Sequence, residues 1–422
     1  MRTIFEAGRR RVLGVLNHAI ARTAAVNFVS VVVLMFTGIL LARGLGEEGR
    51  GKYAAVVVWF GAALVLGELG QSAAVTYFVA RSRSSATAVV RNSRRIMVAT
   101  SFTMVVAGFL GSSFLAGGER ELTFAYVVAF GGVGMYPIWG PYLYALQALS
   151  LSRWNLVRVS QPVLNLVAVI VWYLAAHFTV LAASVCLISS CAVQLLFAYV
   201  SGRRAMLETT DTVSVTAGDL LRFGLKQASS AVPQSVAGSL DRIVLSQVGN
   251  PAALGQYAVA QSVVGAAAPL GTAIASVLFP RLSAFQGDHG ERRRVELRML
   301  YLSAVSMVSA VLLLLVISPW AIPLVFGAAF APAVELTMWV APGAVAQSLL
   351  GITTAFLRGR GTPGRASWAN LLSLAVGALS MFLLVPLLGA RGAALGAFLG
   401  AMTGLGATLL YLRQPQLPAR VK

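Results

Sequence analysis

Long apolar segments alternate with short polar segments along the whole chain. A helix that crosses a bilayer needs about 20 mostly apolar residues. Several of the apolar segments contain proline or glycine, which membrane helices tolerate where neighbouring groups satisfy the freed carbonyls. The pattern predicts twelve transmembrane helices, with loops between them too short to fold as a soluble domain, at residues 23–43, 53–80, 95–117, 121–147, 155–176, 179–201, 219–247, 253–280, 299–325, 332–356, 366–388 and 392–413.

The first 22 residues follow a different pattern. The run Arg9–Arg11 interrupts apolar residues at helical spacing, which is typical of a helix that lies on the membrane surface. A cleaved signal peptide also begins with positive charge. However, the apolar stretch after Arg22 is too long for one, and no small-x-small cleavage site follows it. We therefore expect residues 1–22 to form a cytoplasmic interfacial segment.

The composition narrows the class of protein. Apolar residues make up 58% of the chain and charged residues 11%, against roughly 45–50% and 25% in soluble domains. A soluble enzyme of this length could not bury so much apolar surface, so that class is largely excluded. The two cysteines, Cys186 and Cys191, fall within one apolar segment. We expect them to be small buried residues rather than metal ligands or a disulfide.

The distribution of positive charge predicts the orientation in the membrane. The formal net charge is +19, from 33 lysines and arginines against 14 acidic residues, which in a soluble protein would suggest nucleic acid as a partner. With a cytoplasmic N-terminus, 27 of the 33 cationic residues fall on the cytoplasmic side and five on the other, and Arg242 lies within a span. This asymmetry follows the positive-inside rule. It predicts a multi-pass protein of the plasma (inner) membrane with both termini in the cytoplasm, and no nucleic-acid partner.

A repeat divides the chain into two halves. Gly51-Lys52-Tyr53-Ala54 and Gly255-Gln256-Tyr257-Ala258 open the second and eighth spans, and at this offset of 204 the match gives eight identities in seventeen positions. Each half would hold an even number of spans, so the repeats would be parallel. The predicted fold is all-α and integral to the membrane, with two parallel six-helix lobes around a central cleft. The segments are 1–22 (interfacial), 23–205 (first lobe), 206–413 (second lobe) and 414–422 (cytoplasmic tail).

This is the architecture of a transporter rather than an enzyme. The three histidines fall in predicted loops or a terminus, and no carboxylate pair is spaced for acid–base work.

Motifs spread over most of the chain resemble those of one family. Between residues 220 and 284 they are Phe223-Gly224-Leu225, Asp241, Leu254-Gly255-x-Tyr257-Ala258 and Pro280-x-Leu282-Ser283. Elsewhere they are Leu41-Ala42-Arg43-x-Leu45-Gly46, Gly51-x-Tyr53, Phe326-Gly327 and Pro386-Leu387-Leu388-Gly389-x-x-Gly392-Ala393-Ala394. Together they resemble the polysaccharide (O-antigen type) flippase family of the multidrug/oligosaccharidyl-lipid/polysaccharide exporter superfamily. The chain departs from this pattern at Lys226, where many members have proline, and the related lipid II flippases usually have fourteen spans.

The resemblance implies a carrier that turns a polyprenyl-pyrophosphate-linked oligosaccharide from the cytoplasmic to the outer leaflet, for cell-surface polysaccharide synthesis. Membrane lipids and the lipid-linked oligosaccharide are then its partners, together with a polysaccharide polymerase or glycosyltransferases of the same pathway. No cofactor or metal is expected, and both coupling to an H⁺ or Na⁺ gradient and a passive mechanism stay open.

Charged and polar residues inside the predicted spans are the candidates for the transport site. Glu68, near the membrane midplane, and Asp241, at the family's recurrent acidic position, are candidates for ion coupling or a gate. A protonated Glu68 that only hydrogen-bonds between helices is the alternative. The candidate substrate-binding residues offer positive charge to a pyrophosphate or polar and aromatic contacts to sugars: Lys226, Arg242, Arg158, Arg298, Tyr142 and Gln71. For Lys226 the alternative is snorkelling to the headgroups, and for Arg242 and Tyr142 it is anchoring at the membrane interface.

Three other functions stay open at this point. A multidrug antiporter of the same superfamily would have the same spans but a cavity richer in carboxylates for organic cations. A passive scramblase would need no ion gradient. An integral-membrane glycosyltransferase or polymerase would need a sizeable external loop with catalytic residues, and the predicted outer loops are too short for one.

Overall fold

The computed structural model describes the chain except for residues 1, 176, 208–214, 268–288, 361 and 414–422. The predicted cytoplasmic tail, the Pro280-x-Leu282-Ser283 motif and the second part of the predicted span at 253–280 lie outside the described residues. Within the described ranges the chain is all-helical and contains no strand.

The first half of the chain forms α1 (Arg2–Glu68), α2 (Gln71–Arg81), α3 (Ala86–Leu115), α4 (Arg120–Val133), α5 (Tyr136–Leu149), α6 (Leu151–Ala175) and α7 (Val180–Leu207). The second half forms α8 (Ala217–Ala237), α9 (Leu240–Val248), α10 (Pro251–Gly265), α12 (His289–Phe326), α13 (Ala333–Gly359), α14 (Pro363–Leu388) and α15 (Ala390–Arg413).

Eight of these helices are long and apolar enough to cross a membrane, or nine when α4 and α5, bent by 53° at their junction, count as one span. This differs from the twelve predicted spans because several of them are not single straight helices. The first two predicted spans share α1, which continues through the non-helical residue Gly46 (φ 67°). The predicted spans at 53–80 and 219–247 are each interrupted by a break of two residues. These breaks leave α2 with 11 residues and α9 with 9, each shorter than a bilayer crossing.

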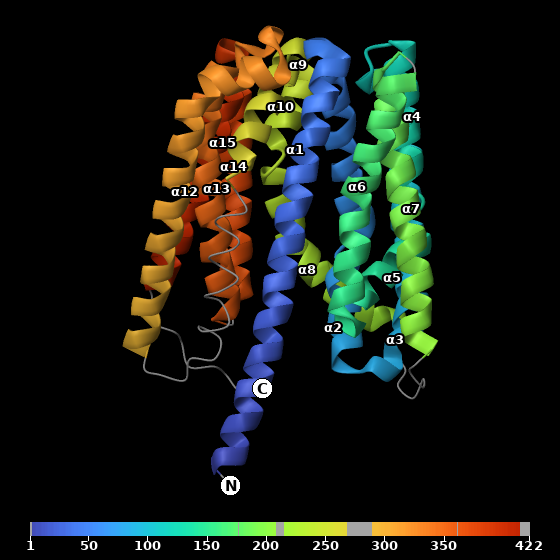
Figure 1. Ribbon diagram of the computed structural model, residues 1–422, viewed down its shortest axis with the longest axis vertical. Helices are drawn as coiled ribbons and strands as arrows, with labels where there is room; N and C mark the ends of the chain where they lie inside the picture. The colour runs from blue at the N-terminus through green and yellow to red at the C-terminus, as the bar shows by residue number, and fades with distance from the viewer. Residues whose placement is uncertain (1, 176, 208–214, 268–288, 361, 414–422) are drawn as a thin grey trace.

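The helices run roughly side by side along the long axis of the molecule (Figure 1). In this view α4 to α7 lie on one side and α12 to α15 on the other, with α1 and α8 between them. We call the end that holds α9 the upper end and the end that holds α2 and α5 the lower end. The helix α8 belongs to the second half by sequence, yet it contacts α2 and α3 as well as α14.

Apolar side chains fill the core and also cover the outer surface of the helices, which accounts for the apolar composition. The largest apolar cluster includes Tyr53, Phe130 and Tyr257, all nearly inaccessible, and it draws on both halves of the chain. Leu110 and Phe114 on α3 are nevertheless 81% exposed. Large exposed apolar side chains along whole helices are disfavoured in water. They suit a multi-pass helical protein surrounded by lipid chains.

Small residues allow the close packing of α14 against α15. Glycines recur at every fourth residue of α15, at Gly392, Gly396, Gly400 and Gly404. A Cβ atom at Gly400 would lie 2.6 Å from the carbonyl oxygen of Ser373 on α14. Without a hydrophobic driving force between helices in lipid, such small-residue stripes give the close backbone approach that holds neighbouring helices together.

The repeated Gly-x-Tyr motif lies where α1 crosses α10. A Cβ atom at Gly51 would lie 1.7 Å from the carbonyl oxygen of Pro251, and one at Gly255 would lie 2.1 Å from that of Glu47. The offset of 204 residues that relates Gly51 to Gly255 also relates Glu47 to Pro251. The two contacts are therefore copies of each other, as expected where two similar units meet across a two-fold axis.

Candidate functional site

The break between α8 and α9 positions Asp241. The helix ends at Ala237 and restarts at Leu240, which places Asp241 in the first turn of α9, where an acidic residue is favoured by the helix dipole. The side chain is buried, with Asp241 only 4% exposed. An ionised carboxylate buried to this degree needs hydrogen-bond donors around it.

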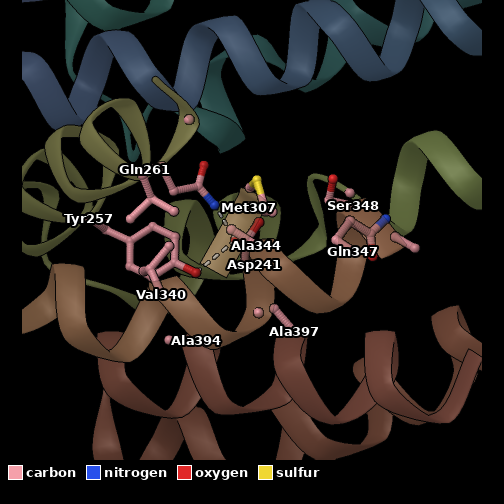
Figure 2. A pocket seen from close by; sticks show the side chains of 15 residues that line it. Asp241, Tyr257, Gln261, Met307, Val340, Ala344, Gln347, Ser348, Ala394 and Ala397 are labelled. Atoms are coloured by element: carbon pink, nitrogen blue, oxygen red, sulfur yellow. Dashed lines mark hydrogen bonds between the residues drawn. The ribbon is translucent and has the colours of Figure 1, made fainter. Parts of the chain in front are cut away.

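Two side chains of α10 supply those donors. The Tyr257 hydroxyl donates to Oδ2 of Asp241 at 2.7 Å, and Nε2 of Gln261 donates to the same oxygen. The other oxygen, Oδ1, accepts the backbone N–H of Arg242 at 2.8 Å. Figure 2 shows the Tyr257 and Asp241 side chains converging across the helices. Since Tyr257 belongs to the repeated motif, the same motif that crosses α1 also fixes the buried carboxylate.

Asp241 forms part of the wall of a cavity of about 340 Å³. Most of the lining is apolar or small, including Met307, Val340 and Ala344 (Figure 2). On α13, Gln347 and Ser348 add polar groups. The volume is at the lower limit for a small-molecule site, so this cavity has room for water, an ion or a sugar unit.

Arg242 lies close to this carboxylate at the upper end, and Arg50 lies near Arg242. Nε of Arg242 is 4.0 Å from Oδ1 of Asp241. Arg50, near the upper end of α1, stacks over the ring of Tyr53 at 5.8 Å and interacts electrostatically with Arg242. The Nε atoms of both arginines are buried and have no hydrogen-bond partner within the described part of the chain. Two neighbouring cations with unused donors form an arrangement that suits an anion.

Arg50 is a residue that the sequence analysis missed. Arg50 is one of the five cationic residues that the charge distribution predicts on the outer side, and no motif assigns it a function. The available signal was its position directly before the repeated Gly51-x-Tyr53 motif, which brings it to the crossing of α1 with the second half. A further contact there is the hydrogen bond of 3.1 Å from Nε1 of Trp59 to Oγ of Ser246 on α9.

Glu68 lies at the break between α1 and α2. Leu69 and Gly70 both have positive φ, of 49° and 72°, and end α1 there. Oε1 of Glu68 accepts the backbone N–H of Ser72 at 2.9 Å, so the carboxylate caps the first turn of α2. The Tyr144 side chain also interacts with Glu68. In each half of the protein, a carboxylate at a helix break therefore has a tyrosine neighbour.

Gln71 follows this break and contacts α8. It is fully buried, and its Nε2 donates to the carbonyl oxygen of Leu220 at 3.5 Å. The Oε1 atom has no partner among the residues that the structure describes. The approach is close, because a Cβ atom at Gly224 would lie 2.6 Å from Nε2 of Gln71. Phe223 adds a ring stacked on Tyr77 of α2, with centroids 4.6 Å apart.

The other candidates are dispersed over the molecule. Lys226 on α8 and Arg298 on α12 are exposed. Arg158 on α6 hydrogen-bonds Asn27 and lies 4.5 Å from the ring centroid of Trp154. Tyr142 is 9% exposed and packs edge-on against Tyr199. The structure thus pairs Asp241 with Arg242 and places Glu68 and Gln71 on either side of one helix break, while the substrate roles of the dispersed residues stay predictions.

The sequence matches the profile of one protein family over most of its length. The sequence profile of the family described as "Polysaccharide biosynthesis protein" matches residues 19–286, which is more than half of the chain. This chain belongs to the polysaccharide biosynthesis protein family. The resemblance inferred from its motifs is confirmed.

Solved structures agree on the fold of this polysaccharide biosynthesis protein. The lipid II flippase MurJ in an inward closed conformation has a TM-score of 0.77 at 11% identity, over 93% of this chain and 87% of that one. A multidrug resistance MATE family transporter of the MOP superfamily in an inward-facing conformation has a TM-score of 0.73 at 18% identity, over 91% and 94%. The outward-facing form of such a transporter has a TM-score of 0.64 at 18% identity, over 94% of each chain. No curated protein matches the sequence.

The polysaccharide biosynthesis protein is therefore a multi-pass membrane protein with the fold of MOP-superfamily transporters. The similar structures include carriers named for drugs and for lipid II. At these identities the likeness establishes the fold and does not choose between such substrates.

Proposed function

We propose that this polysaccharide biosynthesis protein is an alternating-access flippase for a polyprenyl-pyrophosphate-linked oligosaccharide, moving it from the cytoplasmic to the outer leaflet. The observation that carries the proposal is the pair Arg50 and Arg242, whose buried Nε atoms are unpartnered within the described chain. A pyrophosphate supplies several acceptor oxygens and negative charge, which two adjacent guanidinium groups recognise well. Family membership supports a lipid-linked substrate.

The proposed orientation places the lower end in the cytoplasm of the plasma (inner) membrane. The cationic residues predicted to be cytoplasmic, such as Arg94, Arg153 and Arg203, belong to lower-end segments. We further propose twelve crossings in two six-helix lobes, with the broken segments α1–α2, α4–α5 and α8–α9 each completing a crossing. Broken helices that line a cavity are a recurring feature of transporters.

The upper end would be closed in this conformation. One contact that closes this end is the crossing at Gly51 and Gly255. A second contact is made by Arg43 of α1, whose Nε and Nη2 donate to the carbonyl oxygens of Val325 and Leu324 of α12 at 2.7 and 2.6 Å. Substrate would then enter from the lower end and move toward the arginine pair, which lies at this closed upper end because Arg50 directly precedes Gly51. The higher TM-score with the inward-facing than with the outward-facing MATE form agrees with this assignment.

The arginine pair can be tested in proteoliposomes with a fluorescently labelled polyprenyl-pyrophosphate oligosaccharide. Charge-assisted hydrogen bonds contribute about 1.5–3 kcal/mol each, so we expect R50A and R242A each to lower the flipping rate roughly tenfold or more. R120A is the control, because Arg120 is an exposed upper-end cation. Unchanged flipping in the double variant R50A/R242A would refute the pyrophosphate site.

A multidrug antiporter is the second candidate function. The observation that favours it is the buried Asp241 in a largely apolar cavity, since a carboxylate with apolar walls suits an organic cation. Purified protein that binds drug cations and ignores the pyrophosphate-linked lipid would establish this alternative.

Ion coupling is proposed for Asp241 rather than Glu68. Asp241 faces a cavity with room for an ion, whereas the Glu68 carboxylate already caps α2. In gradient-driven flipping, D241N should lose the stimulation by an H⁺ or Na⁺ gradient. E68Q should keep most of it, because the glutamine carbonyl can still accept the Ser72 N–H. A wild-type rate that is equal with and without a gradient would instead indicate a passive scramblase.

A further inference from the structure

A second cavity lies outside the proposed transport route, between α1 and α6 at the lower end. Its volume is about 300 Å³, and the described residues that line it all belong to these two helices. Arg22 of α1 and Arg153 of α6 contribute two positive charges to it. Within the described ranges, no residue of the second half lines this cavity, in contrast to the arginine pair at the upper end.

The start of α6 adds hydrogen-bond donors to this cavity. Leu151, Ser152 and Arg153 are the first three residues of the helix, and all three line the cavity. The first N–H groups of a helix have no intrahelical acceptor and carry the positive end of the helix dipole. With two arginines beside them, they form a site that favours an oxyanion such as a phosphate.

One buried side-chain oxygen in the lining has no hydrogen-bond partner among the described residues. Asn155 is 5% exposed, and its Nδ2 donates to Oγ1 of Thr23 at 2.9 Å. Its carbonyl oxygen Oδ1 has no donor within the described part of the chain. Buried acceptors are normally satisfied, so a ligand that also offers a hydroxyl donor would complete the site. An inorganic phosphate ion would complete the site less well than such a ligand. It would pair with the arginines, but it has a hydrogen-bond donor for Asn155 only in its protonated forms.

The surface beside the cavity is apolar. Leu156 also lines the cavity and is 70% exposed, and Leu151 is 38% exposed. An apolar surface next to a basic pocket at the end of membrane helices is the arrangement that binds the headgroup and the first acyl carbons of an anionic lipid.

We propose that the cavity between α1 and α6 binds an anionic glycerophospholipid of the surrounding bilayer, with its phosphodiester on Arg22, Arg153 and the start of α6 and a headgroup hydroxyl on Asn155. Phosphatidylglycerol has both groups. The volume is sufficient for a phosphoglycerol unit. The site does not depend on which substrate the protein carries.

Native mass spectrometry of the purified full-length protein with phosphatidylglycerol tests this assignment. Each arginine near a lipid phosphate contributes roughly a fivefold gain in binding, so R22A and R153A should each weaken binding about fivefold. R94A, at an exposed cation of the lower end of α3, should leave it unchanged. R22K should retain most of the binding, which separates loss of charge from misfolding.

The headgroup hydroxyl is tested by comparing phosphatidylglycerol with phosphatidic acid, which lacks the glycerol headgroup. The wild-type protein should prefer phosphatidylglycerol severalfold, and N155L should lose this preference while it still binds both lipids. Equal binding of phosphatidylglycerol by wild type and the double variant R22A/R153A would overturn the proposal. So would displacement of phosphatidylglycerol by polyprenyl phosphate, because the cavity would then belong to the carried lipid.

Discussion

At the residue scale, glycines decide how closely the two halves approach. The helices α1 and α10 meet where Gly51 and Gly255 leave room for the carbonyl oxygens of Pro251 and Glu47. Any side chain at these positions would have to displace backbone atoms, which cannot move as a flexible side chain can. The same crossing carries Tyr257, which holds Asp241. The repeated motif thus combines a steric requirement with a polar one.

The substitution G51A tests this requirement. The new Cβ would lie 1.7 Å from the Pro251 oxygen, so we expect the crossing to open and the protein to lose about 1–3 kcal/mol of stability. Hydrogen–deuterium exchange should increase at residues 47–52 and 251–256, and G255A should have the same effect from the other side.

The matched control is G61A on the same helix. A Cβ atom at Gly61 would have no neighbour within 4 Å, and alanine favours helix by up to about 1 kcal/mol over glycine. G61A should therefore leave exchange at the crossing unchanged. Equal exchange in G51A and G61A would contradict the steric argument.

At the element scale, the lower ends of three helices are joined by one buried ion pair. Arg360, directly after α13, pairs with Glu296 of α12, and their side chains are only 11% and 6% exposed. Nη1 of Arg360 also donates to the carbonyl oxygen of Leu412 on α15 at 2.9 Å. Arg360 therefore links α12, α13 and α15 through charged hydrogen bonds, and Glu296 has a further interaction besides this pair.

This arrangement predicts that R360A loses about 1.5–3 kcal/mol of stability, because charge-assisted hydrogen bonds to Glu296 and Leu412 are removed. The loss is measured as a lower midpoint of thermal unfolding in detergent. The control is R391A, which breaks the pair of Arg391 with Glu335 at the upper end, where both side chains are about half exposed, at 50% and 53%. Exposed pairs contribute about 0–1 kcal/mol. Similar midpoints for the two variants would show that the Arg360 pair is not a structural contact.

At the scale of the whole molecule, the halves are held together at the upper end by several independent contacts. Besides the glycine crossing, Nε2 of Gln256 donates to Oε2 of Glu47 at 2.6 Å, and Arg43 and Trp59 of α1 bond to elements of the second half. At the lower end α8 contacts α2 and α3. Alternating access would require the upper contacts to separate in each cycle.

A reversible crosslink at the upper end tests this requirement. Glu47 and Gln256 touch through their side chains, so a short methanethiosulfonate crosslinker should join the variant E47C/Q256C. Flipping should stop, and a reductant should restore it, while the single variants stay active. The native Cys186 and Cys191 are buried and should not react. Full flipping by the crosslinked protein would exclude an alternating mechanism that opens at this end.

The sequence alone determined the class of this protein, its family and the importance of a few positions. Apolar segments of bilayer length are a local property, and the motifs around Asp241 and Tyr257 can be read directly along the chain. Both the multi-pass helical character and the family are confirmed. The positions of the helix breaks were not predicted, because an apolar segment looks the same whether its helix is straight or broken at Gly70 or Gly238.

Only the tertiary structure decided which polar residues meet. Arg50 and Arg242 are separated by almost two hundred residues, and no local pattern relates them, yet the crossing of α1 with α10 brings them into electrostatic range. Likewise, the sequence predicted the carboxylates but not their donors, since Gln261 and Tyr257 reach Asp241 only through the packing of α10 on α9. The spacing of apolar residues along one segment determines that it forms a membrane helix. The packing of helices that are distant in the sequence determines which groups lie next to a buried charged side chain.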